Sequence, residues 1–281
     1  MDGRASSFSA SDAAIDGFRV IGERWRVIAG WSLFNLVALV AMVVITALMI
    51  FIVAATAGSQ AQATSLGGVI GGVGGGLGTF LIEVIIVAAI YRLLLRPDEP
   101  AFLHLRLGGD EFRLLGVWLI VGVCAAVLGA AGVYAATAAG QRAGFAAGLA
   151  TALLVMAGMI YLALRFALAA PMTFTDRRFR FMASWRMTRG RVLPLLGMSA
   201  LTLCLLLLIA VVGWIALSLA IWAATGFNDL GLLSMSDPDH LTARPAAYLT
   251  QLAAQLLFAP FLWVISQAPL VAAYQALSKA D

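Results

Sequence analysis

One carboxylic acid lies well inside a long apolar stretch of the chain. Glu83 is flanked on both sides by apolar residues, from Phe80 to Ile86. In a lipid bilayer an ionisable side chain is costly unless it is protonated, paired or hydrated, which makes Glu83 a functional candidate. Two interpretations stay open: the carboxyl joins helices through a hydrogen bond, or it handles an ion, a proton or a ligand.

Polar side chains form a stripe along the last apolar segment, near residues 247–275. Its side chains recur at multiples of four positions, which places them on one face of a helix. They are Gln251, Gln255, Trp263 and Gln267. At about 1.5 Å per residue along each helix, Gln255 is expected near the depth of Glu83, and we predict that it is the partner of the carboxyl.

Two prolines and an arginine could complete a polar cavity around this site. Pro260 and Pro269 can kink the last segment and free backbone carbonyls, an arrangement that builds cavities but also occurs for packing alone. Tyr161 and Arg165 stand one helical turn apart in an earlier apolar segment. Either they add to the pocket, or Arg165 extends its guanidinium to the membrane headgroups.

Arginines gather before several of the apolar segments, where they are expected to contact phosphate headgroups. The predicted headgroup contacts are Arg19, Arg24, Arg26, Arg106, Arg113, Arg178, Arg180, Arg186 and Arg189. The apolar face of the last cluster is expected to come from Phe179, Phe181, Met182 and Trp185. Attraction to anionic lipid, about 1 kcal/mol per charge near the surface, explains these clusters without nucleic acid.

A glycine-rich run covers residues 67–78. It lacks both the dinucleotide-binding spacing and the Lys-Ser/Thr of a phosphate loop. Its glycines four positions apart predict close packing of helices, with a re-entrant pore loop as the alternative. The glycines that this pattern selects, with two more near residue 146, are Gly68, Gly71, Gly72, Gly75, Gly144 and Gly148.

Signatures of catalysis and metal binding are missing from the sequence. No nucleophile, base and acid form a recognisable set, and His104 and His240 are expected on opposite sides of the membrane. The acidic pairs Asp98-Glu99 and Asp110-Glu111 are interpreted as helix caps and charge partners of neighbouring arginines. We therefore expect no enzyme activity, no cofactor and no metal site.

The composition places the chain in the membrane. Of its 281 residues, 62% are hydrophobic and 11% charged, whereas a soluble domain has about a quarter charged. About 20 apolar residues are needed to cross a bilayer. Six stretches qualify, near residues 27–55, 70–95, 112–138, 143–169, 192–225 and 247–275. The predicted fold class is an all-α integral membrane protein.

The charges between the spans predict the orientation. Basic residues precede the first, third and fifth spans, whereas residues 58–65 carry no charge and the fifth connection contains Asp229, Asp237 and Asp239 against Arg244. Cytoplasmic connections are enriched in Lys and Arg. We expect a multi-pass protein of a bacterial inner membrane with both termini in the cytoplasm.

A repeated motif divides the chain into hairpins. Residues 18–28 match residues 105–115 without a gap in the order apolar, Arg, apolar, Gly, acid, aromatic, Arg. A looser third copy begins at Trp185. The sequence therefore predicts one transmembrane domain over residues 1–281, built from hairpins near 14–96, 97–170 and 171–281. A basic amphipathic interfacial segment is expected before each hairpin.

Two short strings suggest a family. The string Ser184-Trp185-x-x-Thr188-Arg189-Gly190, the six-span layout and the segment from Arg96 through Gly108 resemble bacterial polytopic proteins related to the membrane domain fused to some glycerophosphodiester phosphodiesterases. The resemblance implies a similar membrane architecture. Because the phosphodiesterase domain is absent, it carries over no catalytic residue.

These patterns support two functional hypotheses. The first is a non-enzymatic membrane protein that engages anionic phospholipid at the cytoplasmic leaflet, as an accessory or organising subunit. Its partners would be membrane lipids, together with a second copy of the chain or another membrane protein, and not nucleic acid. The alternative is a small transporter or lipid-moving protein with an intramembrane polar site around Glu83.

Overall fold

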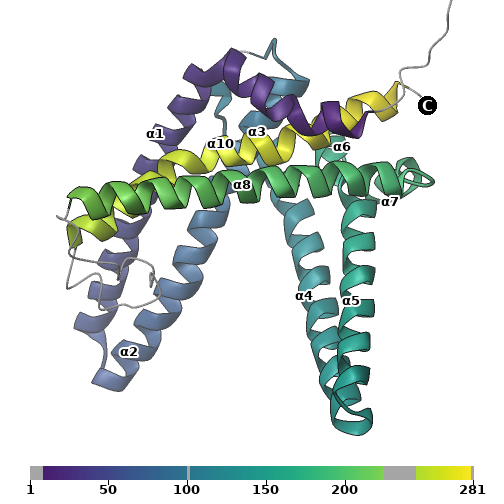
Figure 1. Ribbon diagram of the computed structural model, residues 1–281. Helices are drawn as coiled ribbons and strands as arrows, with labels where there is room; N and C mark the ends of the chain where they lie inside the picture. Colours follow the sequence, from purple (N-terminus) through teal and green to yellow (C-terminus); the bar gives the residue numbers. More distant parts are fainter. Residues whose placement is uncertain (1–8, 100–101, 225–244, 280–281) are drawn as a thin grey trace, which may run out of the picture. The chain divides into compact units, whose positions relative to one another are not determined.

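The computed structural model describes residues 9–99, 102–224 and 245–279 (Figure 1). Every regular element in these ranges is a helix. The helices are α1 (Ala10–Thr56), α2 (Gln60–Val69), the π-helix η1 (Ile70–Gly74), α3 (Gly75–Leu95), the 3-10 helix η2 (Phe102–His104), α4 (Gly109–Ala143), α5 (Phe145–Phe166), α6 (Ala169–Asp176), α7 (Phe181–Met187), α8 (Val192–Ala224) and α10 (Pro245–Ser278).

Six helical segments are long and apolar enough to cross a membrane. They are Ser11–Thr56, Gln60–Leu95, Gly109–Ala143, Phe145–Asp176, Val192–Ala220 and Leu249–Ser278. This confirms the predicted all-α, multi-pass membrane fold. The acidic residues of the fifth connection, Arg244 and His240 lie outside the described residues.

The chain folds as two compact units. The first unit comprises residues up to 16, residues 87–200 and residues from 267 onward, and the second comprises residues 17–86 and 201–266. Helices α1, α3, α8 and α10 contribute to both.

The first unit contains a helical hairpin and a separate apolar core. Helices α4 and α5 lie side by side (Figure 1) and are joined at Gly144, whose φ of +88° is readily accessible to glycine. The core brings together parts of α1, α5, α6, α8 and α10. Its buried members are Ala13, Ala14, Leu164, Leu168, Met172, Leu195, Met198, Ala273 and Leu277.

Helix α1 is longer than the first predicted span, because its polar leader also forms helix. It contains no proline and buries a face that includes Val20, Ile28 and Trp31. The helix is kinked at Arg24, where φ is −124° and ψ is 22°. Arg24 belongs to the repeated motif, so this kink separates the basic leader from the apolar span.

In the second unit, α1 contacts the backbone of α10. Helix α10 continues through Pro260, which has no N–H to donate to the Leu256 carbonyl. The Asn35 side chain donates to that carbonyl instead, at 2.8 Å. Farther along, Gly17 lies so close to α10 that an added Cβ would stand 2.7 Å from the Ile265 Cα. A polar bond and a missing side chain thus fix the register of the two helices.

Candidate functional site

A basic segment, residues 177–191, carries exposed apolar side chains beside exposed arginines. It begins at Arg177, whose φ is +53°, and contains the short helix α7. Phe179 is 53% exposed and Met182 72% exposed. The exposed arginines are Arg177, Arg178, Arg180, Arg186 and Arg189. This segment has the composition predicted for the membrane interface.

The arginines of the basic segment differ in whether an acid compensates them. Arg180 forms an ion pair with Asp176 at 2.8 Å. The side chains of Arg178, Arg186 and Arg189 have no carboxylate within ion-pair distance among the described residues. These three exposed charges are therefore available to an external anion.

The predicted headgroup arginines elsewhere show the same division. In the first unit Arg113 is paired with Asp110 at 2.6 Å, whereas Arg106 is exposed and pairs with no described carboxylate. In the second unit the Arg26 guanidinium lies 5.6 Å from the Trp25 ring centroid, and Arg24 at the kink is exposed.

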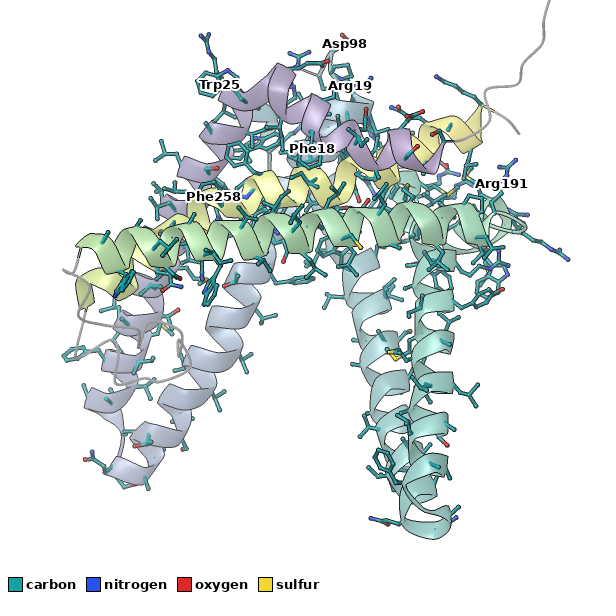
Figure 2. All side chains as sticks on the ribbon, viewed as in Figure 1. Phe18, Arg19, Trp25, Asp98, Arg191 and Phe258 are labelled. Atoms are coloured by element: carbon teal, nitrogen blue, oxygen red, sulfur yellow. The ribbon has the colours of Figure 1, made fainter. Side chains whose placement is uncertain are left out.

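The first copy of the repeated motif also presents aromatic and basic side chains. Figure 2 labels Phe18, Arg19 and Trp25 on α1, and all three are exposed. The aligned second copy differs in local structure, because α4 begins only at Gly109 and the residues before it form no regular helix up to η2. The repeat therefore specifies residue types at the start of a span rather than one backbone conformation.

Arg165, at the end of α5, is buried under α7 and does not extend outward. Arg165 is 5% exposed. The guanidinium carbon lies 4.3 Å from the Trp185 ring centroid and 5.6 Å from that of Tyr161. Nη1 donates to the Thr188 hydroxyl at 3.3 Å, and Nε has no hydrogen-bond partner among the described residues. The extension to the headgroups that we considered for Arg165 is therefore not what the structure shows.

Two hydroxyls, one in α7 and one in the residue that follows it, explain why α7 packs against the end of α5. Helix α5 ends at Phe166, so the Arg165 carbonyl lacks a helical partner of its own. The Ser184 hydroxyl donates to this carbonyl at 2.8 Å, and the Thr188 hydroxyl lies 3.4 Å from it. Both side chains are fully buried. The Ser-Trp-x-x-Thr spacing thus places two capping hydroxyls and one ring around the same arginine.

The charge of Arg165 is only partly compensated within the chain. Desolvated cation–π contacts contribute about 2 kcal/mol, and a cation at a helix C-terminus gains at most a similar amount. Burying a charge costs several kcal/mol, and each buried donor without an acceptor costs about 1–3 kcal/mol more. No described carboxylate pairs with Arg165.

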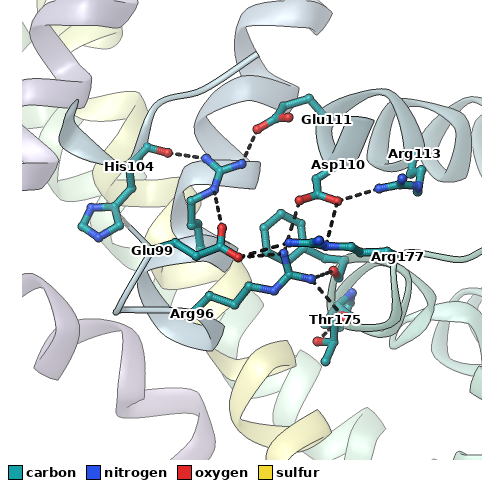
Figure 3. A network of polar contacts seen from close by, with 11 residues as sticks. Arg96, Glu99, His104, Asp110, Glu111, Arg113, Thr175 and Arg177 are labelled. Atoms are coloured by element: carbon teal, nitrogen blue, oxygen red, sulfur yellow. Dashed lines mark hydrogen bonds and ion pairs between the residues drawn. The ribbon is translucent and has the colours of Figure 1, made fainter. Parts of the chain in front are cut away.

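In a second cluster of the first unit, by contrast, acids pair with the buried arginine (Figure 3). Arg92, which is 1% exposed, donates from Nη2 to the buried Glu111 carboxylate at 2.5 Å and from Nη1 to the His104 carbonyl. Glu99 lies 3.8 Å from its Nε. The Phe174 ring packs over the guanidinium at 5.8 Å.

Arg96 extends this charge network to α6. It pairs with Glu99 and Asp110 at 3.3 Å each and donates to the carbonyls of Phe174 and Thr175. Three of the four acids that were interpreted as caps or charge partners thus pair with arginine, namely Glu99, Asp110 and Glu111. The network joins α3, α4 and the end of α6, which is a structural role.

Three members of the predicted intramembrane site, Glu83, Gln251 and Gln255, belong to the second unit. Glu83 is half-buried and forms no hydrogen bond or ion pair with any residue that the structure describes. Gln251 is buried, whereas Gln255 is exposed. The expected bond between Glu83 and Gln255 is not formed, because Gln255 faces outward from α10.

The other members, Gln267, Tyr161 and Arg165, belong to the first unit. The Tyr91 hydroxyl donates to the Gln267 amide oxygen at 2.7 Å. Tyr161 packs edge-on against Trp185, with ring centroids 6.2 Å apart. Within this unit each of the three side chains contacts a residue that was not among the predicted members of the site.

The glycine run is helical throughout, so the re-entrant loop is wrong. Its middle forms the π-helix η1. Of the predicted packing positions, Gly71 faces Ile50 of α1, whereas Gly68, Gly72 and Gly75 face open space in the described chain. Gly67 and Gly71 both meet the Ile50 side chain, so the face that contacts α1 is one residue removed from Gly68 and Gly72.

The two later glycines lie at the hairpin of α4 and α5. Gly144 makes the turn, and Gly148 approaches the Gly140 Cα so closely that an added Cβ would stand 3.0 Å from it. The predicted packing glycines did not include Gly140. The sequence signal for this contact was a small residue eight positions before Gly148, on the other side of the one-residue turn.

Sequence reasoning also missed the most buried polar contacts. It did not single out Arg92, Asn35 or Tyr91. Arg92 lies in the last turn of an apolar helix, which is a signal for a buried pair, but nothing local identifies Glu111 as its partner.

Comparisons with known proteins found no match: no family model, no curated protein and no solved structure is similar to this chain. The resemblance to the membrane domain of some glycerophosphodiester phosphodiesterases stays a prediction. What the fold and composition define is a class, the multi-pass α-helical membrane proteins.

Proposed function

We propose that this protein binds anionic phospholipid through the basic segment and acts as a non-enzymatic accessory or organising subunit. The observation that carries the proposal is the set of three exposed arginines, Arg178, Arg186 and Arg189, that have no described acidic partner. They stand beside the exposed apolar side chains of Phe179 and Met182.

This combination suits the boundary between headgroups and acyl chains. An apolar side chain gains free energy by leaving water, and each arginine near an anionic surface gains about 1 kcal/mol. Three arginines would then favour an anionic over a zwitterionic lipid by up to about 3 kcal/mol before screening by salt.

The proposed location is the cytoplasmic leaflet of a bacterial inner membrane, with both termini in the cytoplasm. It is supported by the arginines that precede the first, third and fifth spans and by the absence of charge in residues 58–65. A second copy of the chain or another membrane protein would be the partner that the protein organises.

The test is the lipid selectivity of the reconstituted protein. Arg178, Arg186 and Arg189 are replaced together by Gln, and the preference of the lipids at the protein boundary for phosphatidylglycerol over phosphatidylcholine is measured by electron spin resonance. We expect the preference to fall several-fold. The control is Arg142→Gln, which removes an exposed charge from the last turn of α4. Equal selectivity in the wild type and the triple variant would contradict the proposal.

A transporter or lipid-moving role around Glu83 is the second candidate. The observation that favours it is a half-buried carboxyl with no described partner in a membrane helix. Native mass spectrometry of the wild type beside Glu83→Gln tests it. A specific small adduct lost in the variant supports transport, whereas adducts retained equally in both argue against it.

A further inference from the structure

The buried guanidinium of Arg165 has the features of an anion site. It belongs to a residue that is 5% exposed, its Nε has no described partner, and its one hydrogen bond runs from Nη1 to the Thr188 hydroxyl. Hydrogen-bond donors of this kind are rarely buried without an acceptor. No carboxylate of the described chain supplies one.

The groups around Arg165 determine which edge of its guanidinium an anion could bind. The rings of Trp185 and Tyr161 pack against the guanidinium, with centroids 4.3 and 5.6 Å from its central carbon. The donors lie in the plane of the group, and the edge with Nε and Nη2 is the one that makes no bond within the described chain. This edge matches two oxygens of a phosphate group, which guanidinium binds in a bidentate manner.

Neighbouring residues strengthen the case for a phosphate. Arg186 follows Trp185 and Arg189 follows Thr188, so both exposed arginines are adjacent in sequence to residues that touch Arg165. A single phosphate could then be held by one buried guanidinium and approached by two exposed ones. The exposed Met182 on the same short helix would lie beside the acyl chains of a lipid.

We propose that Arg165, held by Trp185 and Thr188 at the junction of α5 and α7, binds one phosphate group of a membrane lipid. This inference rests on the proposed function and deepens it, because it separates one specific headgroup site from the general attraction of the exposed arginines. The phosphate itself is recognised here, so phosphatidylcholine should enter the site as well as phosphatidylglycerol. Preference for the anionic lipid would come from the exposed charges.

Native mass spectrometry of the full chain in mild detergent tests the proposal. Phosphatidylglycerol, phosphatidylcholine or inorganic phosphate is titrated into the wild type and into Arg165→Gln. We expect the first lipid to bind the wild type at least about ten-fold more tightly than later ones, and this difference to disappear in Arg165→Gln for both lipids. Equal affinity of the first lipid for the wild type and the variant would overturn the proposal.

The other arms separate the remaining outcomes. If Arg165→Gln abolishes binding of one inorganic phosphate and leaves lipid binding unchanged, the site recognises a phosphate but the lipid assignment is overturned. Arg165→Lys keeps the charge without the bidentate edge and serves if Arg165→Gln does not fold; it should also lose the first tight lipid. Replacing Arg178, Arg186 and Arg189 should lower only the preference for phosphatidylglycerol. The two proposals can therefore fail independently.

Discussion

The buried pair of Arg92 and Glu111 should respond unequally to the loss of each partner. Arg92→Met leaves a buried carboxylate whose described cation is gone. Two unit charges about 4 Å apart interact by about 4 kcal/mol at an effective dielectric constant of 20, and breaking a buried pair costs about 3–5 kcal/mol. We expect Arg92→Met to lower the free energy of unfolding by about 4 kcal/mol.

Loss of the acid should cost less. In Glu111→Leu the Arg92 side chain keeps Glu99 at 3.8 Å and the carbonyl of His104. We therefore expect a loss of about 2–3 kcal/mol. The double variant removes both charges together and should return to within about 1 kcal/mol of the wild type, because a buried ion pair and an apolar pair of similar size differ little in stability.

Reversible unfolding in mixed micelles, titrated with a denaturing detergent and followed by tryptophan fluorescence, measures the stability of the wild type and the three variants. The reasoning is refuted if Arg92→Met loses less than about 1 kcal/mol, or if the double variant loses the sum of the two single variants.

Three further outcomes are expected. Asn35→Leu should lower the free energy of unfolding by about 1–3 kcal/mol, and by clearly less in a Pro260→Ala background, where the carbonyl that Asn35 serves regains its helical partner; the same titration measures both. Gly17→Ala should lower the midpoint of thermal unfolding because its Cβ would press into the backbone of α10, whereas Gly22→Ala, on the same helix but with no atom within 4 Å, should leave it unchanged or raise it. A Ser59→Cys variant in a background without other cysteines should react with a membrane-impermeant maleimide on intact cells, and labelling only after lysis would contradict the proposed orientation.

The predictable part of the fold came from patterns that are local in the sequence. Apolar runs of sufficient length identified all six spans, and the basic residues of segment 177–191 identified an exposed stretch. The ends of the helices were harder to predict from the sequence. The first span begins in a helix that starts at Ala10, and the kink at Arg24 depends on how α1 packs rather than on a proline.

The candidate site was predictable only as a set of residue types. Arg165, Trp185 and Thr188 were each noted for a different reason, and nothing local showed that they meet. Glu83 and Gln255 were expected to bond because their depths agreed, but depth does not specify which way a helix face points. Gly68 and Gly72 do not contact α1 because they lie one residue away from the face of Gly67 and Gly71, which meets Ile50.

The sequence by itself determined that this chain is helical and crosses a membrane, because burial in lipid requires apolar residues that are consecutive along the chain. Only the tertiary structure decided which polar groups meet. Glu111 lies 19 positions from Arg92, Thr188 lies 23 from Arg165, and the Leu256 carbonyl lies 221 from Asn35. Contacts over such separations follow from helix packing and register. These set whether a buried arginine meets an acid, as Arg92 does, or, among the described residues, two rings and a hydroxyl, as Arg165 does.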